Sequence, residues 1–119
     1  MYHTISEKEA ERLASGIPNA AAVDQIAAMF KALGDPTRVR IIQLLLQTEL
    51  CVHDLAQLLG TSQPATSHHL RVLRMLHLVR TRREGAAIHY SLDDQHVSDL
   101  LRLSLAHALH GMDIARPDA

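Results

Sequence analysis

Apolar residues recur at the spacing of an α-helix over the first two-thirds of the chain. Residues 4–15 predict a short polar helix, with Ser6 as its N-terminal cap and Glu9 as the partner of that cap. A second helix is predicted over residues 20–33, because its apolar residues share one face. The sequence GDPT at 34–37 then carries the signals that end this helix and begin a third.

A pair of helices in the middle of the chain predicts a helix-turn-helix unit. The first helix covers residues 52–59 and ends at Gly60. The second begins in the sequence TSQP, with Thr61 or Ser62 as its cap, and runs to about Leu76. Two helices joined by a short turn that contains glycine have the arrangement of this motif.

The hydrophobic period changes after this unit. Two β-prone runs, Val79–Arg83 and Ile88–Leu92, flank Gly85 and predict a hairpin. The stretch from Asp93 to His110 returns to a helical period. This order of elements predicts a mainly α fold with a small β-hairpin, which is a winged helix-turn-helix.

Length and composition indicate one domain. The chain has 119 residues, enough for a single modest core. We expect an N-terminal extension with a short helix at 1–19, a winged helix-turn-helix for DNA binding and dimerisation at 20–110, and a C-terminal tail at 111–119. One cysteine fits a reducing compartment, and no apolar run reaches the length of a membrane span. A cytoplasmic protein without a membrane partner is therefore expected.

Charge is unevenly distributed, although the formal net charge is only -1. Residues 61–83 hold five arginines and no acidic residue. Residues 91–119 hold five aspartates against two arginines. The basic middle of the chain is suited to phosphate, and the acidic end is suited to cations.

The second helix of the helix-turn-helix unit divides into an apolar and a polar side when it is wound at about 100° per residue. The polar side carries Ser67, His68 and Arg71 near the end where a recognition helix reads base edges. His69 falls on the other side and is expected to be partly buried. On the hairpin, Arg82 and Arg83 are placed to contact phosphates or the minor groove. Five arginines without an acid in this arrangement favour double-stranded DNA as the partner.

The last helix carries metal-ligand residues at both ends, in the pattern D-x-H-x10-H-x2-H formed by Asp94, His96, His107 and His110. On a straight helix His96 and His107 lie about 16 Å apart, so that one ion cannot bind both. Eleven residues nevertheless turn the helix to within about 20° of a whole number of turns. The histidines therefore share one stripe, with leucines between them.

An antiparallel pair of such helices would close two equivalent sites across a dimer. Each site would hold three imidazoles and one carboxylate, a set that suits tetrahedral Zn²⁺ or Co²⁺. Four protein ligands leave no open position for hydrolysis. We therefore expect a regulatory metal, no enzymatic activity and no small organic substrate.

Three stretches of the sequence closely resemble the ArsR/SmtB family of bacterial metal-responsive repressors: FKALGDPTRVRIIQLL, ELCVHDLAQLLGTSQPATSHHLRVLRMLHLV and REGAAIHYSLDDQHV. The resemblance covers about residues 25–110. It implies a homodimeric repressor that binds an imperfect palindrome and leaves it when metal binds. It further implies that residues 64–76 are the recognition helix and that Gln63, Ser67 and His68 touch DNA. The four-ligand pattern matches the last-helix site of the zinc and cobalt sensors of this family.

Some members of this family carry a second site that uses a Cys-x-Cys pair and N-terminal ligands. Here the corresponding position reads Cys51-Val52-His53, and the N-terminus offers His3 but no cysteine. A weak second site from these residues is the alternative to a buried Cys51 beside a solvated His53. Cadmium or arsenic sensing through three thiolates is excluded within one chain. With His3 added to the last-helix ligands, an octahedral set would favour Ni²⁺ or Co²⁺ instead.

Metal is expected to act through the geometry of the dimer, by holding the recognition helices out of register with successive major grooves. The second ring nitrogen of His107 is expected to reach the main chain near His77, which would link the site to the recognition helix. Three other readings stay open: a repressor that senses oxidation at Cys51, a small zinc enzyme, and a purely structural metal dimer.

Overall fold

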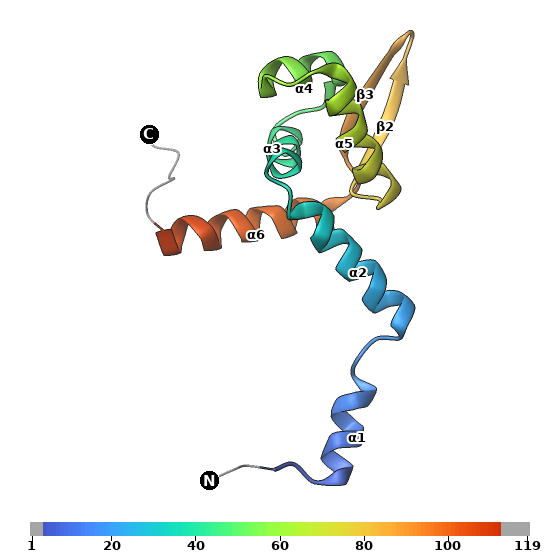
Figure 1. Cartoon of the computed structure of the whole chain (residues 1–119), viewed down its shortest axis with the longest axis vertical. Helices are drawn as coiled ribbons and strands as arrows, with labels where there is room; N and C mark the ends of the chain where they lie inside the picture. The colour runs from blue at the N-terminus through green and yellow to red at the C-terminus, as the bar shows by residue number, and fades with distance from the viewer. Residues whose placement is uncertain (1–3, 113–119) are drawn as a thin grey trace.

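The computed structural model describes residues 4–112, with side chains through Gly111. Within this range the chain forms helices around a small antiparallel sheet (Figure 1). In chain order the elements are α1 (Glu7–Ser15), α2 (Ala20–Leu33), α3 (Pro36–Leu45), β1 (Leu50–Cys51), α4 (Val52–Leu59), α5 (Gln63–Met75), β2 (Val79–Glu84), β3 (Ala87–Leu92) and α6 (Gln95–Met112). The winged helix-turn-helix predicted from the sequence is confirmed.

Polar caps fix the starts of the helices much as the sequence predicts. The side chains of Ser6, Asp35 and Ser62 each accept a hydrogen bond from a backbone N–H three residues further on. Of the two candidates at the start of α5, Ser62 is thus the cap. The hydroxyl of Thr61 instead forms a hydrogen bond of 2.8 Å with the buried hydroxyl of Thr66.

The wing has three strands, whereas the sequence predicted a hairpin alone. β2 and β3 pair along their whole length and turn at Gly85, where φ is 62°. β1 pairs with the other edge of β3, so that the strand order is β1-β3-β2. A strand of two residues is too short to show alternation, and sequence periodicity therefore missed it.

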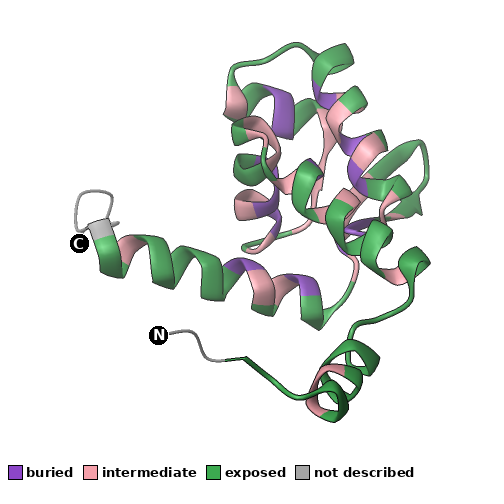
Figure 2. Cartoon of the chain, turned by 60° about the horizontal axis from the view of Figure 1, so that its bottom comes forward, coloured by how far each residue is buried: buried purple, intermediate pink, exposed green. Residues whose placement is uncertain are grey.

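The core lies where α3, α4, α5, the wing and the start of α6 meet. Figure 2 shows that the buried residues are concentrated in this body, while α1 and the outer part of α6 are mostly exposed. The core cluster consists of Ile41, Ile42, Leu45, Leu55, Leu70, Leu73, Leu78, Val79, Leu92, Val97 and Leu101.

Three helices extend from this body. α6 leaves it on one side, and α2 leads away to α1 at the far end of a molecule that measures 61 × 36 × 23 Å (Figure 1). Apolar side chains on these helices stay exposed in one protomer, among them Phe30 on α2 and Leu103 on α6. A large exposed apolar face is typical of a protein–protein interface. In the described part of the chain no helix is both long and apolar enough to span a membrane.

Candidate functional site

α5 is fixed in the body by one fully buried face. Thr66, Leu70 and Leu73 each have 0% exposure and lie one turn or so apart along the helix. Because these side chains point inward, the opposite face of α5 is turned to solvent. His68 and Arg71 are exposed on that face, as predicted, whereas Ser67 is only half-exposed.

His69 connects α5 to the start of α3. It is half-buried, as expected, and its Nδ1 accepts a hydrogen bond of 3.0 Å from Nε of Arg38. The backbone N–H of Arg38 in turn lowers the pKa of the Asp35 carboxyl below its ordinary value. The hydrogen bond between His69 and Arg38 thus holds α5 against α3, in addition to the packing of its apolar face.

Gln63 stands at the first position of α5 and contacts the preceding helix. Its Nε2 lies 3.0 Å from Nδ1 of His53, on the first turn of α4. Both side chains are on exposed residues. His53 is exposed, as the alternative to a second metal site expected, but the Cys51 of that alternative is half-buried instead of buried.

The two wing arginines differ in their surroundings. Arg82 forms ion pairs of 2.7 Å with Glu49, before β1, and of 2.7 Å with Glu84, at the end of β2. These hydrogen bonds lower the pKa of both carboxyls and raise that of the guanidinium. Arg82 is thus paired within the protomer, a feature that charge distribution along the sequence did not reveal. Arg83 is exposed on the same strand.

The candidate second metal site does not assemble within the described residues. Cys51 is half-buried and lies opposite His89 in the pairing of β1 with β3. His53 is turned toward Gln63, and His3 lies outside the described residues. Among residues 4–112, no three His, Cys, Asp or Glu side chains stand close enough together to hold a metal ion.

The first pair of candidate metal ligands lies at the start of α6. Asp94 precedes the helix, and its Oδ1 accepts a hydrogen bond of 3.1 Å from the N–H of Val97. This bond lowers the pKa of the Asp94 carboxyl. Nδ1 of His96 lies 3.6 Å from the same carboxylate oxygen, and the His96 side chain is 95% exposed.

The second pair stands at the other end of the helix. His107 and His110 are exposed and lie about one turn apart. One protomer therefore brings the four predicted ligands together as two pairs, one at each end of α6. A metal site of four ligands requires both kinds of pair at the same place.

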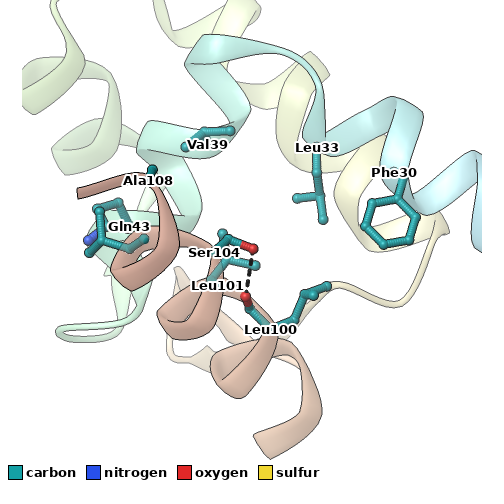
Figure 3. Close-up of a pocket in the computed structure, with 9 residues that line it drawn as sticks. Phe30, Leu33, Val39, Gln43, Leu100, Leu101, Ser104 and Ala108 are labelled. Carbon is teal, nitrogen blue, oxygen red and sulfur yellow. Dashed lines mark hydrogen bonds between the residues drawn. The ribbon is translucent and has the colours of Figure 1, made fainter. Parts of the chain in front are cut away.

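An apolar groove runs beside α6, between this helix and α2 and α3 (Figure 3). Phe30 and Leu33 line it from α2, and Leu100 and Leu105 line it from α6. Leu103, in the middle of the stripe between the histidines, is 70% exposed. The groove and the stripe together leave apolar surface that one protomer does not cover.

His77 ends α5 in a conformation that the sequence did not predict. Its φ is 58°, the left-handed region in which glycine is usual. The N–H of His77 donates to the carbonyl of Arg74, and that of Leu78 donates to the carbonyl of Leu73. These two bonds form the Schellman motif, and the His77 side chain itself is exposed.

Comparison with known proteins agrees with this geometry. Residues 35–81 match the family described as bacterial regulatory protein, arsR family. The chain is 46% identical over 83 residues to the cadmium resistance transcriptional regulatory protein CadC homolog of Staphylococcus aureus, a match that covers 69% of each protein. The chain belongs to the ArsR/SmtB family.

The matches to two further ArsR/SmtB relatives cover different shares of those relatives' lengths. The transcriptional repressor SmtB homolog of Synechocystis is 49% identical over 66% of this chain, and the match spans only 59% of that relative. The HTH-type transcriptional regulator NmtR of Mycobacterium tuberculosis is 43% identical over 82% of this chain and 84% of its own length.

A solved structure, described as a possible ArsR-family transcriptional regulator, supports the fold. A winged helix-turn-helix DNA-binding domain from Mycobacterium bovis, homodimeric in solution, superposes with a TM-score of 0.76 at 28% identity and with 100% coverage of both chains. The protein is accordingly a transcriptional regulator of this family, built on a winged helix-turn-helix.

Proposed function

We propose that the protein represses transcription in its metal-free form and leaves its operator when Zn²⁺, or Co²⁺, binds between the last helices of the two protomers. Each of two equivalent sites would consist of Asp94 and His96 from one protomer with His107 and His110 of the partner subunit. The observation that carries this proposal is the placement of two exposed ligand pairs at opposite ends of α6.

The dimer that closes these sites would also cover the exposed apolar surface. In an antiparallel arrangement of two α6 helices, the stripe around Leu103 packs on its own copy. The groove beside Phe30 and Leu33 is continuous with that stripe, because Leu100 belongs to both. Burial of this surface supplies the hydrophobic stabilisation of association, and the ligand pairs then meet at its two ends.

The set of ligand atoms favours a metal ion of intermediate softness. Three imidazoles and a carboxylate match tetrahedral Zn²⁺ or Co²⁺. The name of the Staphylococcus aureus relative refers to cadmium resistance, yet this chain has a single cysteine and cannot supply several thiolates from one protomer. The carboxylate of Asp94 is ionised at neutral pH, as that of an ordinary aspartate is, and the hydrogen bond from the N–H of Val97 lowers its pKa further. Metal would therefore not have to displace a proton from it.

Metal binding at α6 would be coupled to DNA binding at α5 because of the way in which each helix is attached to the body. α5 is embedded in the body, so that a rotation of one body against the other moves the whole recognition helix. A clamp on both α6 helices would fix the bodies in an arrangement that does not match successive major grooves. The coupling free energy of such systems is typically about 1–3 kcal/mol, or roughly 5- to 150-fold in DNA affinity.

The test is a Co²⁺ optical titration of the metal-free homodimer. We expect strong tetrahedral bands without sulfur charge transfer, saturating at two ions per dimer. His96→Gln should abolish these bands, whereas the control His68→Gln, on the reading face of α5, should leave them unchanged. Weak octahedral bands would point to Ni²⁺ or Co²⁺ sensing with His3, and sulfur bands would move the site to Cys51.

A DNA measurement separates a sensor from a structural metal dimer. Duplexes selected by the metal-free protein from a randomised inverted-repeat library serve as the probe. We expect Zn²⁺ to weaken binding to them by about 5- to 150-fold, and a chelator to restore it. His96→Gln should bind the duplexes normally and resist release by Zn²⁺. If the chelator unfolded the protein instead, the metal would be structural and the proposal wrong.

A further inference from the structure

One polar contact joins the two helices of the helix-turn-helix unit at their exposed edge. Nε2 of Gln63, at the start of α5, lies 3.0 Å from Nδ1 of His53, at the start of α4. Neither residue is buried, and the core does not require either side chain. The contact lies where α5 presents its N-terminal end, the part of a recognition helix that enters the major groove.

In the arrangement observed, the amide nitrogen of Gln63 faces Nδ1 of His53, and this placement sets the direction of the hydrogen bond. An amide nitrogen carries two hydrogens and no available lone pair, so that Nε2 of Gln63 must donate. Nδ1 of His53 must therefore accept, which requires a neutral ring with its proton on Nε2. The carbonyl oxygen of Gln63 is left as the acceptor on the side away from His53.

An isolated glutamine reads DNA without such a bias. Its amide can be turned over by a rotation of half a turn, which exchanges the positions of a donor and an acceptor of almost equal size. In the major groove, adenine and cytosine offer amino groups, while guanine and thymine offer carbonyl oxygens. The orientation of the amide therefore decides which of these two classes of base it pairs with.

We propose that His53 is a positioning residue that fixes the amide of Gln63 with its oxygen toward the DNA, and that it thereby selects adenine or cytosine at one base of each half-site. This inference rests on the proposed function insofar as Gln63 must contact operator DNA. Adenine is the better fit, because the second N–H of the amide can pair with N7 of adenine.

The expected size of the effect is modest and specific to one position. A hydrogen bond between neutral groups typically contributes a net preference of about 2- to 10-fold. The contact involves no phosphate. Its loss should change the base preference at a single position and leave the general affinity for DNA and its dependence on salt unaltered.

The experiment compares variants of the full-length, metal-free homodimer on a library of short duplexes with a randomised inverted repeat. Gln63→Ala first identifies the position that Gln63 reads, as the base whose preference it removes. His53→Ala should then lower the preference for adenine or cytosine at that same position by about 2- to 10-fold. The matched control is Asp54→Asn, an exposed neighbour on α4, which should retain the preference.

A reversal variant gives the sharper test. In His53→Lys the ammonium can only donate, so that it would hold the carbonyl oxygen of Gln63 and turn the amide nitrogen toward the groove. The preferred base should become guanine or thymine. The added charge raises affinity for all sequences alike, and the ratio between bases cancels this effect. Urea denaturation of each variant checks that the fold is retained.

The outcomes separate this inference from the proposed function. Unchanged base preference in both His53→Ala and His53→Lys would overturn the positioning role. If Gln63→Ala altered no position, Gln63 would not read DNA and the inference would fail with that contact. Failure of Zn²⁺ to release DNA, with the base preferences as expected, would overturn the proposed metal response and leave the role of His53 established.

Discussion

α5 carries two histidines and α6 carries three, yet the two helices are held in opposite ways. α5 has a fully buried face, and its His69 is bound by Arg38 of the same chain. α6 is anchored only near its start, by Val97 and Leu101, and its outer turns extend from the body (Figure 1). One protomer therefore determines the geometry of α5, whereas the metal site proposed on α6 would be complete only in a dimer. Under the proposed function, this division would allow a signal at α6 to move α5 as part of a rigid body.

The largest expected effect comes from breaking the buried face of α5. Leu70→Ala removes a side chain of 0% exposure and leaves a cavity in the core. Such substitutions typically destabilise a protein by about 2–5 kcal/mol. Urea denaturation followed by circular dichroism measures the loss. A destabilisation well below 1 kcal/mol would mean that α5 is not held by this core.

The matching change on α6 should weaken association instead. Leu103 is 70% exposed in one protomer, so that Leu103→Ala leaves the core intact. Since each dimer contains two copies, and a buried leucine contributes about 1.5–3 kcal/mol, we expect the dissociation constant of the dimer to rise at least about tenfold. Sedimentation equilibrium measures it. A dimer of unchanged affinity would show that the interface lies elsewhere.

The wing offers a change of intermediate size on the DNA-reading side. Glu49→Gln removes one of the two carboxylates that bind Arg82. The guanidinium then stays paired with Glu84 alone, and its Nε and second NH2 group become available for a phosphate. We expect DNA affinity to rise several-fold at low salt, and the slope of log K against log salt to steepen by about 0.9 for each phosphate contacted. Fluorescence anisotropy over a salt series measures both. Arg83→Gln serves as a comparison, because it should make the slope shallower.

The cap of α3 gives a smaller effect that depends on pH. The pKa of Asp35 is lowered in the folded protein, chiefly by the N–H of Arg38. Its contribution to stability is therefore present above the unfolded pKa of about 3.9 and is lost as the pH falls through the lower folded value. Asp35→Asn retains the cap without the charge. The urea midpoint of the wild type should thus fall toward that of the variant between pH 5 and pH 2, as a paired titration would show.

The smallest change should lie at the end of α5. His77 has a φ of 58°, which burdens a residue with a side chain by about 1 kcal/mol relative to glycine. Replacing His77 by glycine would remove this cost, but part of the stabilisation would be offset by the greater freedom of glycine in the unfolded chain. We expect His77→Gly to stabilise the protein by a few tenths of a kcal/mol, measured from the urea midpoint. A loss of stability would mean that the imidazole contributes contacts of its own.

Local signals predicted much of the fold, because they act between residues that are close in the chain. The GDPT sequence does end one helix and begin the next, and the buried stripe of α5 lies close to its predicted side. The stripe is centred on Leu70 more than on His69, because Leu70 belongs to the core cluster, whereas His69 is half-buried and forms a hydrogen bond with Arg38. Strand β1 was not predicted from the sequence, because only its pairing with β3 identifies it as a strand.

The candidate sites also differ in whether the sequence could predict them. The ligand pattern of α6 can be read from spacing alone, because a helix places residues at fixed angles and heights. The pairing of Arg82 with Glu49 cannot, since thirty-three residues separate the two in the chain. The contact of His53 with Gln63 depends likewise on how α4 and α5 pack.

The sequence by itself determined the order of the helices, the winged helix-turn-helix class and the placement of two pairs of candidate ligands on α6, all of which follow from short-range periodicity and residue chemistry. The tertiary structure alone decided which charged and polar groups meet: Arg38 with His69, Arg82 with its two carboxylates, and His53 with Gln63. The physical reason is range. Helical geometry is set within a few residues, whereas a contact between distant side chains is set by the packing of the whole core.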